Sequence, residues 1–293
     1  MVNRRQNIDP PTFTPSQYGL LTVAQTPPSA DAHWMNGVTY QTRCINSADT
    51  IYDACIAVTG TGPPPAAPSK TNNTSLVFRG ATPFTVYTEF ACAPIGISDA
   101  QKIATDALTQ SAPWEVEYAF WTGKAANQNV VYPHLAAGTQ VLDADSIILQ
   151  SAATTVTGSA VNVRVGIGLL EEAIGNCSNG QGVIHVQRKV LSALFFSQLV
   201  ESRGGQLFTK SGNLVAVGSG YPGTGPTGQA ITATTSWMFA TGTVFAMTGP
   251  VRVLNQRETL DRTTNTVAML AERTYLLGWD CCHAAVQVDI SAA

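Results

Sequence analysis

The sequence is poor in charge, because lysine, arginine, aspartate and glutamate together make up 12% of its 293 residues, against about 25% in ordinary soluble domains. A monomer needs charge on its surface to stay soluble, whereas the cores of interfaces between chains are depleted in charge. The composition therefore favours either a chain that hides much of its surface against other chains or a slowly evolving sequence rich in alanine, threonine and glycine. The formal net charge of −3 argues against an electrostatic binder of nucleic acid, which carries a basic face.

Signals for export and for a membrane are also lacking. Residues Met1–Gln6 lead into a polar, proline-bearing stretch, so no signal peptide is predicted. No window approaches the run of about 18 apolar residues that a membrane span requires. We therefore expect a chain without a membrane partner, in a cytoplasm-like compartment.

The cysteines do not form the pairs that bind zinc, since none belongs to a CxxC motif and Cys281 directly precedes Cys282. In a reducing compartment, cysteine is expected as a free thiol that behaves as a small buried hydrophobe. Reduced thiols are thus predicted at all six positions. These are Cys44, Cys55, Cys92, Cys177, Cys281 and Cys282.

Catalytic motifs are scarce, and the sequence has no GxSxG, HExxH or GxxxxGK[ST] pattern. Residues Gly218–Gly223 match GxGxxG, which binds dinucleotides only where a helix begins inside it. Pro222, Pro226 and further glycines predict a flexible surface loop there, and the acidic residue expected about 20 positions later is missing. A nucleotide-binding enzyme that uses this loop is the alternative from another class of function.

The histidines and paired carboxylates do not suggest a site either. His185 interrupts an apolar stretch, where a hydrogen-bonded core or interface histidine is expected. Glu171-Glu172 is interpreted as a pair on a helix surface, and Asp143 with Asp145 as a turn. No catalytic, cofactor-binding or metal-binding residue is predicted. The histidines are His33, His134, His185 and His283.

Proline is concentrated at the start of the chain, where nine of the 16 prolines precede residue 70. Proline fixes φ and removes a backbone donor, so residues 1–40 are predicted to be an extended arm without regular ladders. The arm contains more large apolar groups than a disordered tail carries. We therefore expect a strap that lies along its own subunit or along a neighbour. These apolar residues are Tyr18, Leu20, Leu21, Val23, Trp34 and Met35.

Strand-like composition follows at residues 38–59 and 76–92, separated by a polar loop at 60–75 that is too long for an ordinary connection. The first helix is predicted to start at Ser98, where Ser98 and Gln101 form a capping box. Pro113 is expected to interrupt this helix.

A second helix is predicted to begin with Ser111 and Pro113 and to end at Gly123. Further helices are expected at 160–175, before Gly175, and at 189–203, closed by Gly204-Gly205.

A buried strand is expected at 182–186, and a hairpin at 206–217 turns at Ser211-Gly212-Asn213. Beyond residue 230 the pattern is almost entirely strand. The whole is an α+β chain with strand-rich ends and helices in the middle. The late strands are predicted at 234–240, 243–247, 250–254, 266–279 and 283–290.

The order of these elements resembles the Hong Kong 97-type major capsid protein family of tailed bacteriophages, whose fold is shared with encapsulins. Gly182–Gln187 followed by the predicted helix Val190–Arg203 resembles the strand and helix of the family's A domain. Leu207–Val217 resembles the hairpin that follows. Asn265–Arg273, with its Glu-Arg pair, resembles the closing strand that leads to a small-residue turn and a last apolar strand, here Ala284–Ile290.

The resemblance implies a division of the chain into an N-terminal arm, an E-loop, a P domain and an A domain. The arm would be residues 1–37 and the E-loop 38–80. The P domain would be discontinuous, combining 81–177 with 251–293, and the A domain would be 178–250. Pro113 inside a helix departs from the family's pattern, and Lys70 is the only lysine in the E-loop range.

As function, the resemblance implies a major capsid protein that self-assembles in the host bacterial cytoplasm into the icosahedral head shell of a virion. The partners would be many copies of the same chain, in hexamers and pentamers, with scaffold, portal and decoration proteins as further candidates. Packaged double-stranded DNA would meet the inner face weakly. An encapsulin-type nanocompartment shell is the alternative within the same fold, and no enzyme activity or cofactor is implied.

Overall fold

The computed structural model describes residues 13–27, 32–42, 77–92, 97–124, 131–178, 180–254, 260–261, 263 and 266–291. Within these ranges the chain forms three sheets, a long α-helix and three shorter α-helices. The fold is of the predicted α+β class. The greater part of the predicted strands 38–59 and the whole loop 60–75, with Lys70, lie outside the described residues.

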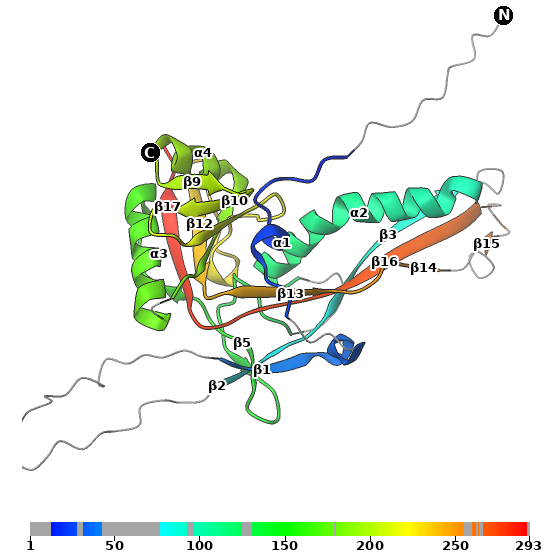
Figure 1. The fold of residues 1–293 in the computed structure, drawn as a ribbon, viewed down its shortest axis with the longest axis horizontal. Helices are drawn as coiled ribbons and strands as arrows, with labels where there is room; N and C mark the ends of the chain where they lie inside the picture. Colours follow the sequence, from blue (N-terminus) through cyan, green and yellow to red (C-terminus); the bar gives the residue numbers. More distant parts are fainter. Residues whose placement is uncertain are drawn as a thin grey trace, which may run out of the picture.

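An eight-stranded sheet with helices α3 (Val163–Ser178) and α4 (Arg188–Phe196) forms one end of the molecule, and we call this part the body (Figure 1). Its strands run in the order β6-β17-β12-β8-β11-β10-β9, and β7 also pairs with β17. The strands are β6 (Thr154–Thr155), β7 (Val161–Asn162), β8 (Val183–Gln187), β9 (Val200–Arg203), β10 (Gln206–Thr209), β11 (Leu214–Gly218), β12 (Thr235–Thr241) and β17 (His283–Asp289).

The centre of the body is buried on both faces. β8 pairs in parallel with β11 and antiparallel with β12, and four of its five residues are buried. A strand covered on both sides is expected to be continuously apolar. Residues Val183–Val186 fit this except at His185, and the strand predicted at 182–186 is confirmed.

A second sheet, of five strands, extends away from the body. It contains β13 (Val244–Thr248), β16 (Thr266–Trp279) and β14 (Arg252–Val253), and β3 (Phe84–Cys92) and β15 (Leu260–Asp261) also pair with β16. Helix α2 (Ile97–Thr122) packs on β3 and β16. Together α2, β3, β14 and β16 form an elongated part that we call the blade (Figure 1).

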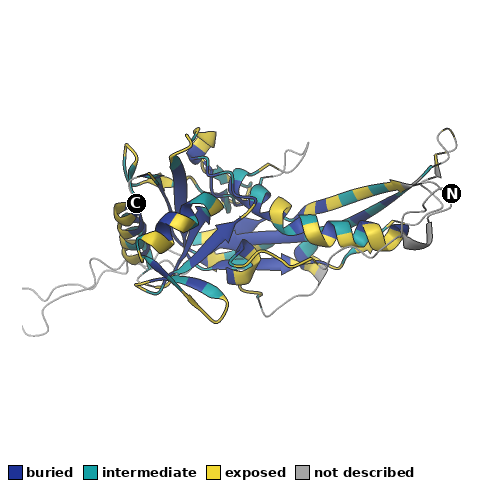
Figure 2. Cartoon of the chain, turned by 90° about the horizontal axis from the view of Figure 1, so that it is seen from above, coloured by how far each residue is buried: buried dark blue, intermediate teal, exposed yellow. Residues whose placement is uncertain are grey.

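Burial changes along the blade. In β16, residues 268–272 alternate between buried and half-buried, whereas residues 275–279 are buried without interruption. In β3, Phe84 and Val86 are buried, whereas the neighbouring Tyr87 is exposed. Figure 2 shows the same gradient, from continuous burial near the body to striped exposure toward the far end. One face of the blade is therefore covered by its own chain and the other is not.

A small third sheet lies beside the blade, in the order β1-β2-β5-β4. β1 and β2 form an antiparallel ladder in which Val38 pairs with Ala81 and Thr42 with Val77. The predicted strands at the beginning of 38–59 and in 76–92 are thus confirmed. The strands are β1 (Val38–Thr42), β2 (Val77–Ala81), β4 (Val141–Leu142) and β5 (Ile148–Gln150).

The helix break predicted at Pro113 is wrong, because α2 runs without interruption from Ile97 to Thr122. Buried residues on both sides of the proline, such as Leu108 and Val116, pack into the same core. This packing stabilises a continuous helix, although Pro113 has no N–H to donate to the carbonyl of Thr109, an exposed residue. The helix does end where predicted, at Gly123, whose φ of 72° suits the C′ position.

The fourth helix is shorter than predicted. α4 ends at Phe196, and Val200–Arg203 forms strand β9 of a hairpin with β10. Gly204 and Gly205 have φ of 56° and 82°, as both central residues of a type I′ hairpin turn require. These glycines close a hairpin and do not terminate a helix. The next predicted hairpin is confirmed, since β10 pairs with β11 around Gly212.

The described part of the arm lies along its own subunit. It forms helix α1 (Leu20–Val23) and the 3-10 helix η1 (Ala32–Asn36), and Gln25 makes a parallel bridge with Phe245. Leu20 and Val23 are fully or almost fully buried in the main core cluster. The predicted absence of ladders is therefore only partly correct, and the arm's buried apolar groups need no neighbouring subunit to cover them.

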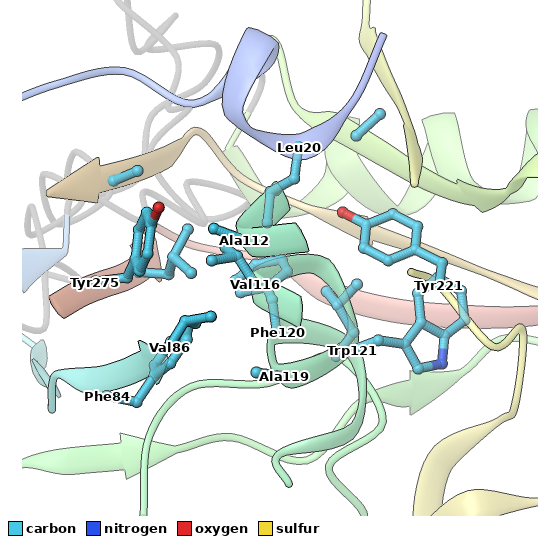
Figure 3. Packing of buried hydrophobic residues seen from close by; sticks show 14 of the residues in the cluster. Leu20, Phe84, Val86, Ala112, Val116, Ala119, Phe120, Trp121, Tyr221 and Tyr275 are labelled. Atoms are coloured by element: carbon cyan, nitrogen blue, oxygen red, sulfur yellow. The ribbon is translucent and has the colours of Figure 1, made fainter. Parts of the chain in front are cut away.

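The main core lies where arm, blade and body meet. Figure 3 shows Leu20 pointing toward Ala112 and Val116 of α2, with Phe84, Val86 and Tyr275 on one side and Trp121 and Tyr221 on the other. Trp121 packs edge-on against Phe239 of β12, with ring centroids 4.9 Å apart. The C-terminal end of α2 thus joins the two larger sheets.

The cysteine prediction needs correction, because Cys177 and Cys282 are joined by a disulfide, with Cα atoms 5.6 Å apart. Cys281 is disulfide-bonded as well. Cys177 lies in the last turn of α3, and Cys282 lies in the turn between β16 and β17. The two residues are 105 positions apart in the chain, so spacing alone gave no sign that they meet.

Candidate functional site

A buried carboxylate marks the meeting point of arm, long helix and glycine-rich loop. Glu117, on α2, is only 4% exposed. Its Oε1 accepts a hydrogen bond from the Leu20 backbone N–H (3.1 Å), and its Oε2 accepts one from the Gly220 N–H (2.9 Å). A hydrogen bond from the Ser219 N–H also stabilises the carboxylate. Glu117 therefore fastens two segments far apart in the sequence to one turn of the helix.

The loop at Gly218–Gly223 is a packed segment and not the predicted flexible surface loop. A Cβ on Gly220 would lie 2.1 Å from the Trp114 carbonyl oxygen, so only glycine lets the loop approach α2 this closely. Gly223, with φ of 76°, lies against Gln187 and Ser236. The glycines of the GxGxxG match thus serve close packing.

The same loop does not have the geometry of a dinucleotide site. β11 ends at Gly218, and the next helical element is the three-residue 3-10 helix η3 (Pro226–Gly228). The Gly220 N–H, which would be available to a phosphate in such a site, is bonded to Glu117. The absence of a helix start, predicted from Pro222, is confirmed.

The electrostatics of Glu117 reflect two opposing effects. Burial raises the pKa of the carboxyl above its ordinary value, while the hydrogen bonds from Gly220, Leu20 and Ser219 and the nearby Arg188 guanidinium lower it. Burial dominates. Burial and the Glu117 charge in turn raise the pKa of Tyr221 well above its ordinary value. Arg188 donates to the hydroxyls of Ser16 and Ser219, and so ties the arm to the loop a second time.

A hollow of about 780 Å³ opens beside Glu117, between the arm, α2 and α4. Large apolar side chains stand around it, namely Phe13, Leu21 and Trp114 (44% exposed). Trp114 stacks on Tyr118 at a centroid distance of 5.3 Å. This is an apolar surface with one charged pair, Glu117 and Arg188, and it has no arrangement of acid, base and nucleophile.

Two histidines are buried in the core, and both make hydrogen bonds. The Thr241 hydroxyl donates to the Gly242 carbonyl, so the His185 Nε2–H donates to Thr241 Oγ1 (2.9 Å) and the Tyr221 hydroxyl donates to Nδ1 (3.2 Å). Burial lowers the pKa of His185 to about 3. The predicted role of His185 as a hydrogen-bonded core histidine is confirmed.

His283 lies between two backbone carbonyls, that of Ser151 at Nδ1 (3.0 Å) and that of Leu135 at Nε2 (2.9 Å). Burial lowers its pKa to about 4, despite both carbonyls favouring the charged ring. Burial also lowers the pKa of His134, whose Nδ1 lies 3.0 Å from the Tyr132 carbonyl. The rings of His283 and His134 thus bind to backbone carbonyls.

The carboxylate pairs have structural positions. Asp143 Oδ1 accepts hydrogen bonds from the backbone of Asp145 and Ile147, which is the predicted turn. Glu171 accepts from Ser211 and Asn213 across to the β10–β11 turn, while Glu172 is exposed on α3. Among the described residues no group of His, Cys, Asp or Glu could hold a metal ion. Within the same ranges no helix is long and apolar enough to span a membrane.

Exposed large apolar residues are found in two further parts of the molecule. On the blade, Tyr87 of β3 is 58% exposed and Ile103 of α2 is 41% exposed. At the end of α4, Phe195 and Phe196 are exposed, the latter to 75%. Exposed apolar groups of this size mark contact surfaces more often than they mark chemistry.

Sequence reasoning missed Glu117, although a signal was present. It stands one helical turn before Trp121, which is fully buried, and residues four apart share a helix face. A carboxylate in register with a buried tryptophan needs hydrogen-bond partners when the helix packs. The partners themselves, Leu20 and Gly220, could not be identified, because each lies about 100 residues away along the chain.

No family model matches the sequence, and no curated protein matches it. Solved structures do. The capsid of a native GTA particle matches with a TM-score of 0.58 at 11% identity, over 98% of this chain and 95% of that one. A chain from Mycobacterium phage Bobi matches with a TM-score of 0.53 at 12% identity, over 98% and 95%.

The capsid of Ralstonia phage GP4 matches at 0.51 and 10% identity, again over 98% and 95%. The chain has the Hong Kong 97-type capsid fold. The predicted resemblance to this fold is therefore confirmed over nearly the whole chain. At 10–12% identity the Hong Kong 97-type likeness lies in the arrangement of elements and not in shared short motifs.

Proposed function

We propose that this chain is a major capsid protein, which self-assembles in a bacterial host into the icosahedral head shell of a virion around packaged double-stranded DNA. The observation that carries the proposal is the match of the whole fold, over 98% of the chain, to the capsid of a GTA particle at a TM-score of 0.58. The low charge and the exposed apolar residues of the blade support a subunit that works among copies of itself.

The proposed division of the chain keeps the ranges implied by the resemblance. Residues 1–37 are the arm and 38–80 the E-loop, whose base is the β1–β2 ladder. Residues 81–177 with 251–293 are the P domain, which includes the blade, and 178–250 are the A domain. Hydrogen bonding crosses this division, because β17 of the P domain pairs with β12 of the A domain. The two domains thus share a sheet and are expected to fold as one unit.

The partners proposed are other copies of the chain, arranged in pentamers and hexamers, as fits a relative whose capsid was computed with C5 symmetry. Scaffold, portal and decoration proteins are further candidates, and DNA would meet the inner face only weakly because of the net charge of −3.

An encapsulin-type shell is less favoured, since the matching capsids are those of a phage and of a GTA particle. A nucleotide-binding enzyme is also less favoured, since the Gly218–Gly223 loop is packed against α2.

The test is to express the full chain alone and with candidate scaffold, and to examine the particles by electron microscopy. We expect closed shells built of five-fold and six-fold clusters. A chain that remains monomeric with and without scaffold would contradict the proposal. Small closed shells that form unaided and retain a cargo enzyme would support the encapsulin alternative.

A further inference from the structure

The body and the five-stranded sheet are joined at a tight double crossing. The chain passes from β12 to β13 at Gly242-Thr243 and from β16 to β17 at Asp280–Cys282. The Gly242 N–H donates to the Cys281 carbonyl (2.7 Å), and the Asp280 N–H donates to the Thr243 carbonyl (3.0 Å). A Cβ on Gly242 would lie 2.6 Å from that same Cys281 oxygen. We call these two crossings the joint, because they carry the chain connections β12–β13 and β16–β17 between the two sheets.

A disulfide attaches the joint to a helix of the body. Cys282 belongs to the joint, and its φ of 61° places it in the left-handed region, which non-glycine residues adopt only in special turns. Its partner, Cys177, lies in the last turn of α3. α3 is itself fixed on the sheet, since a Cβ on Gly166 would lie 2.5 Å from Val288 of β17. The disulfide therefore limits how far the joint can move relative to the body.

The bacterial cytoplasm, in which the chain is expected to fold, disfavours the Cys177–Cys282 disulfide. Disulfides do not persist in a bacterial cytoplasm, where thiol systems keep cysteines reduced. The proposed function places folding in a bacterial cytoplasm, yet the folded chain brings these two sulfurs together in a disulfide. Two cysteines that can form a disulfide, in a chain made in a reducing compartment, indicate that the pair is reduced at one stage and oxidised at another.

We propose that the Cys177–Cys282 pair is a redox-controlled lock on the joint, open as two thiols while the chain folds and closed as a disulfide once it leaves the reducing cytoplasm. The timing rests on the proposed function as a virion subunit, whereas the effect of the lock on the joint does not. In the open state the angle between body and blade can adjust during assembly. In the closed state that angle is fixed.

The chemistry requires an oxidant of the small-molecule disulfide class. The Cys177 thiolate attacks one sulfur of that disulfide, forms a mixed disulfide and releases one small thiolate. The Cys282 thiolate then attacks the Cys177 sulfur, forms the protein bond and releases the second small thiolate. Two protein thiols are oxidised and one small disulfide is reduced to two thiols. Cys177 reacts first because it is half-buried, whereas Cys282 is only 8% exposed.

The experiment uses the full chain and the double variant Cys177→Ala/Cys282→Ala, each with and without a phosphine reductant. The reductant also breaks the disulfide of Cys281. The variant, which lacks the Cys177–Cys282 bond, therefore measures the effect of reducing the Cys281 bond alone. We expect reduction to lower the melting temperature of the wild-type chain by about 5–10 °C more than that of the variant. On reduction, hydrogen exchange at residues 241–243 and 280–283 should speed up at least tenfold more in the wild-type chain than in the variant.

Two results would overturn the lock. If the double variant lacked secondary structure by circular dichroism, the bond would be needed for folding and could not be opened. If exchange at the joint were equal in the oxidised and reduced wild type, the bond would not restrain it.

Alkylation of thiols on lysis, followed by mass spectrometry, tests the timing. We expect Cys177 and Cys282 to be alkylated in freshly lysed cells and bonded to each other in particles exposed to oxidised glutathione. Particles that keep both thiols under that oxidant would contradict the proposal. If the melting temperature and hydrogen exchange respond to reduction as expected in a chain that never forms shells, the lock is supported. Only the proposed function is then contradicted.

Discussion

The body and the blade both carry large apolar residues, but they differ in how far the chain itself buries them. In the body, the central strand β8 is buried on both faces, and α3 and α4 pack on its sheet. In the blade, α2 covers one face of β3 and β16, while side chains such as Tyr87 and Ile103 remain exposed. The body thus completes its own core, and the blade does not complete its surface.

This difference separates stability from assembly. Burial within one chain determines the free energy of folding, since apolar area removed from water contributes about 25 cal/mol per Å². Exposed apolar area contributes nothing to folding of the single chain and becomes favourable only when another chain covers it. We therefore expect substitutions of buried residues in the body to change the free energy of unfolding. Substitutions of exposed apolar residues on the blade should change assembly instead.

The largest effect is expected from Phe239→Ala in the body. Phe239 is fully buried on β12 and packs edge-on against Trp121. Truncation of such a ring lowers the free energy of unfolding by about 3–5 kcal/mol. Urea denaturation of the single chain measures it. A loss below about 1 kcal/mol would show that the body is not the main source of stability.

Acid should destabilise the body through its buried histidines. Burial lowers the pKa of His185 to about 3 and that of His283 to about 4, from an ordinary value of 6.5. The unfolded chain therefore binds protons that the folded chain does not, and stability falls as the pH drops below about 6.5. Linkage gives a loss of about 2 kcal/mol per histidine between pH 7 and pH 5.

Urea denaturation at a series of pH values checks this loss, and His185→Gln should remove about half of the dependence on pH between 7 and 5. An unchanged dependence in that variant would mean that His185 is not the buried neutral group described here.

A smaller effect is expected where arm, blade and body meet. Glu117→Ala leaves the N–H groups of Leu20, Gly220 and Ser219 without their carboxylate, and the loss is about 1–3 kcal/mol. Residues 13–27 should then be cut faster by protease. Glu115→Ala, on the exposed face of the same helix, is the matched control. Equal proteolysis of the two variants would show that Glu117 does not hold the arm.

The smallest effect on stability, with the largest on assembly, is expected on the blade. Tyr87→Ala and Ile103→Ala should each change the free energy of unfolding by less than about 0.5 kcal/mol and yet reduce the yield of shells. Leu142→Ala, a similarly exposed residue outside the blade, is the control. Normal assembly of both blade variants would contradict the claim that the exposed apolar residues of the blade serve assembly.

The sequence predicted most strands because their causes are local. Alternation and β-branched runs indicated the strands at 266–279 and 283–290, and a glycine turn indicated the hairpin around Gly212. The hairpin at Gly204-Gly205 was also within reach, since two consecutive glycines between strand-like residues predict a type I′ turn. Because the apolar helix pattern runs to residue 203, the prediction places these glycines at the end of a helix.

The remaining features depend on contacts between distant segments. Pro113 does not break α2, because Leu108 and Val116 pack into one core on either side of it. The Gly218–Gly223 loop is buried, because Gly220 meets Trp114 across more than 100 residues of chain. The same holds for Glu117 and for the Cys177–Cys282 disulfide. No local pattern encodes which segments meet.

The most direct test of the account is electron cryo-microscopy of particles assembled from the full chain. The account predicts closed shells in which neighbouring copies cover Tyr87 and Ile103 of every blade, while the core of each body is formed within one chain. A shell in which these two side chains face solvent in all copies would contradict it.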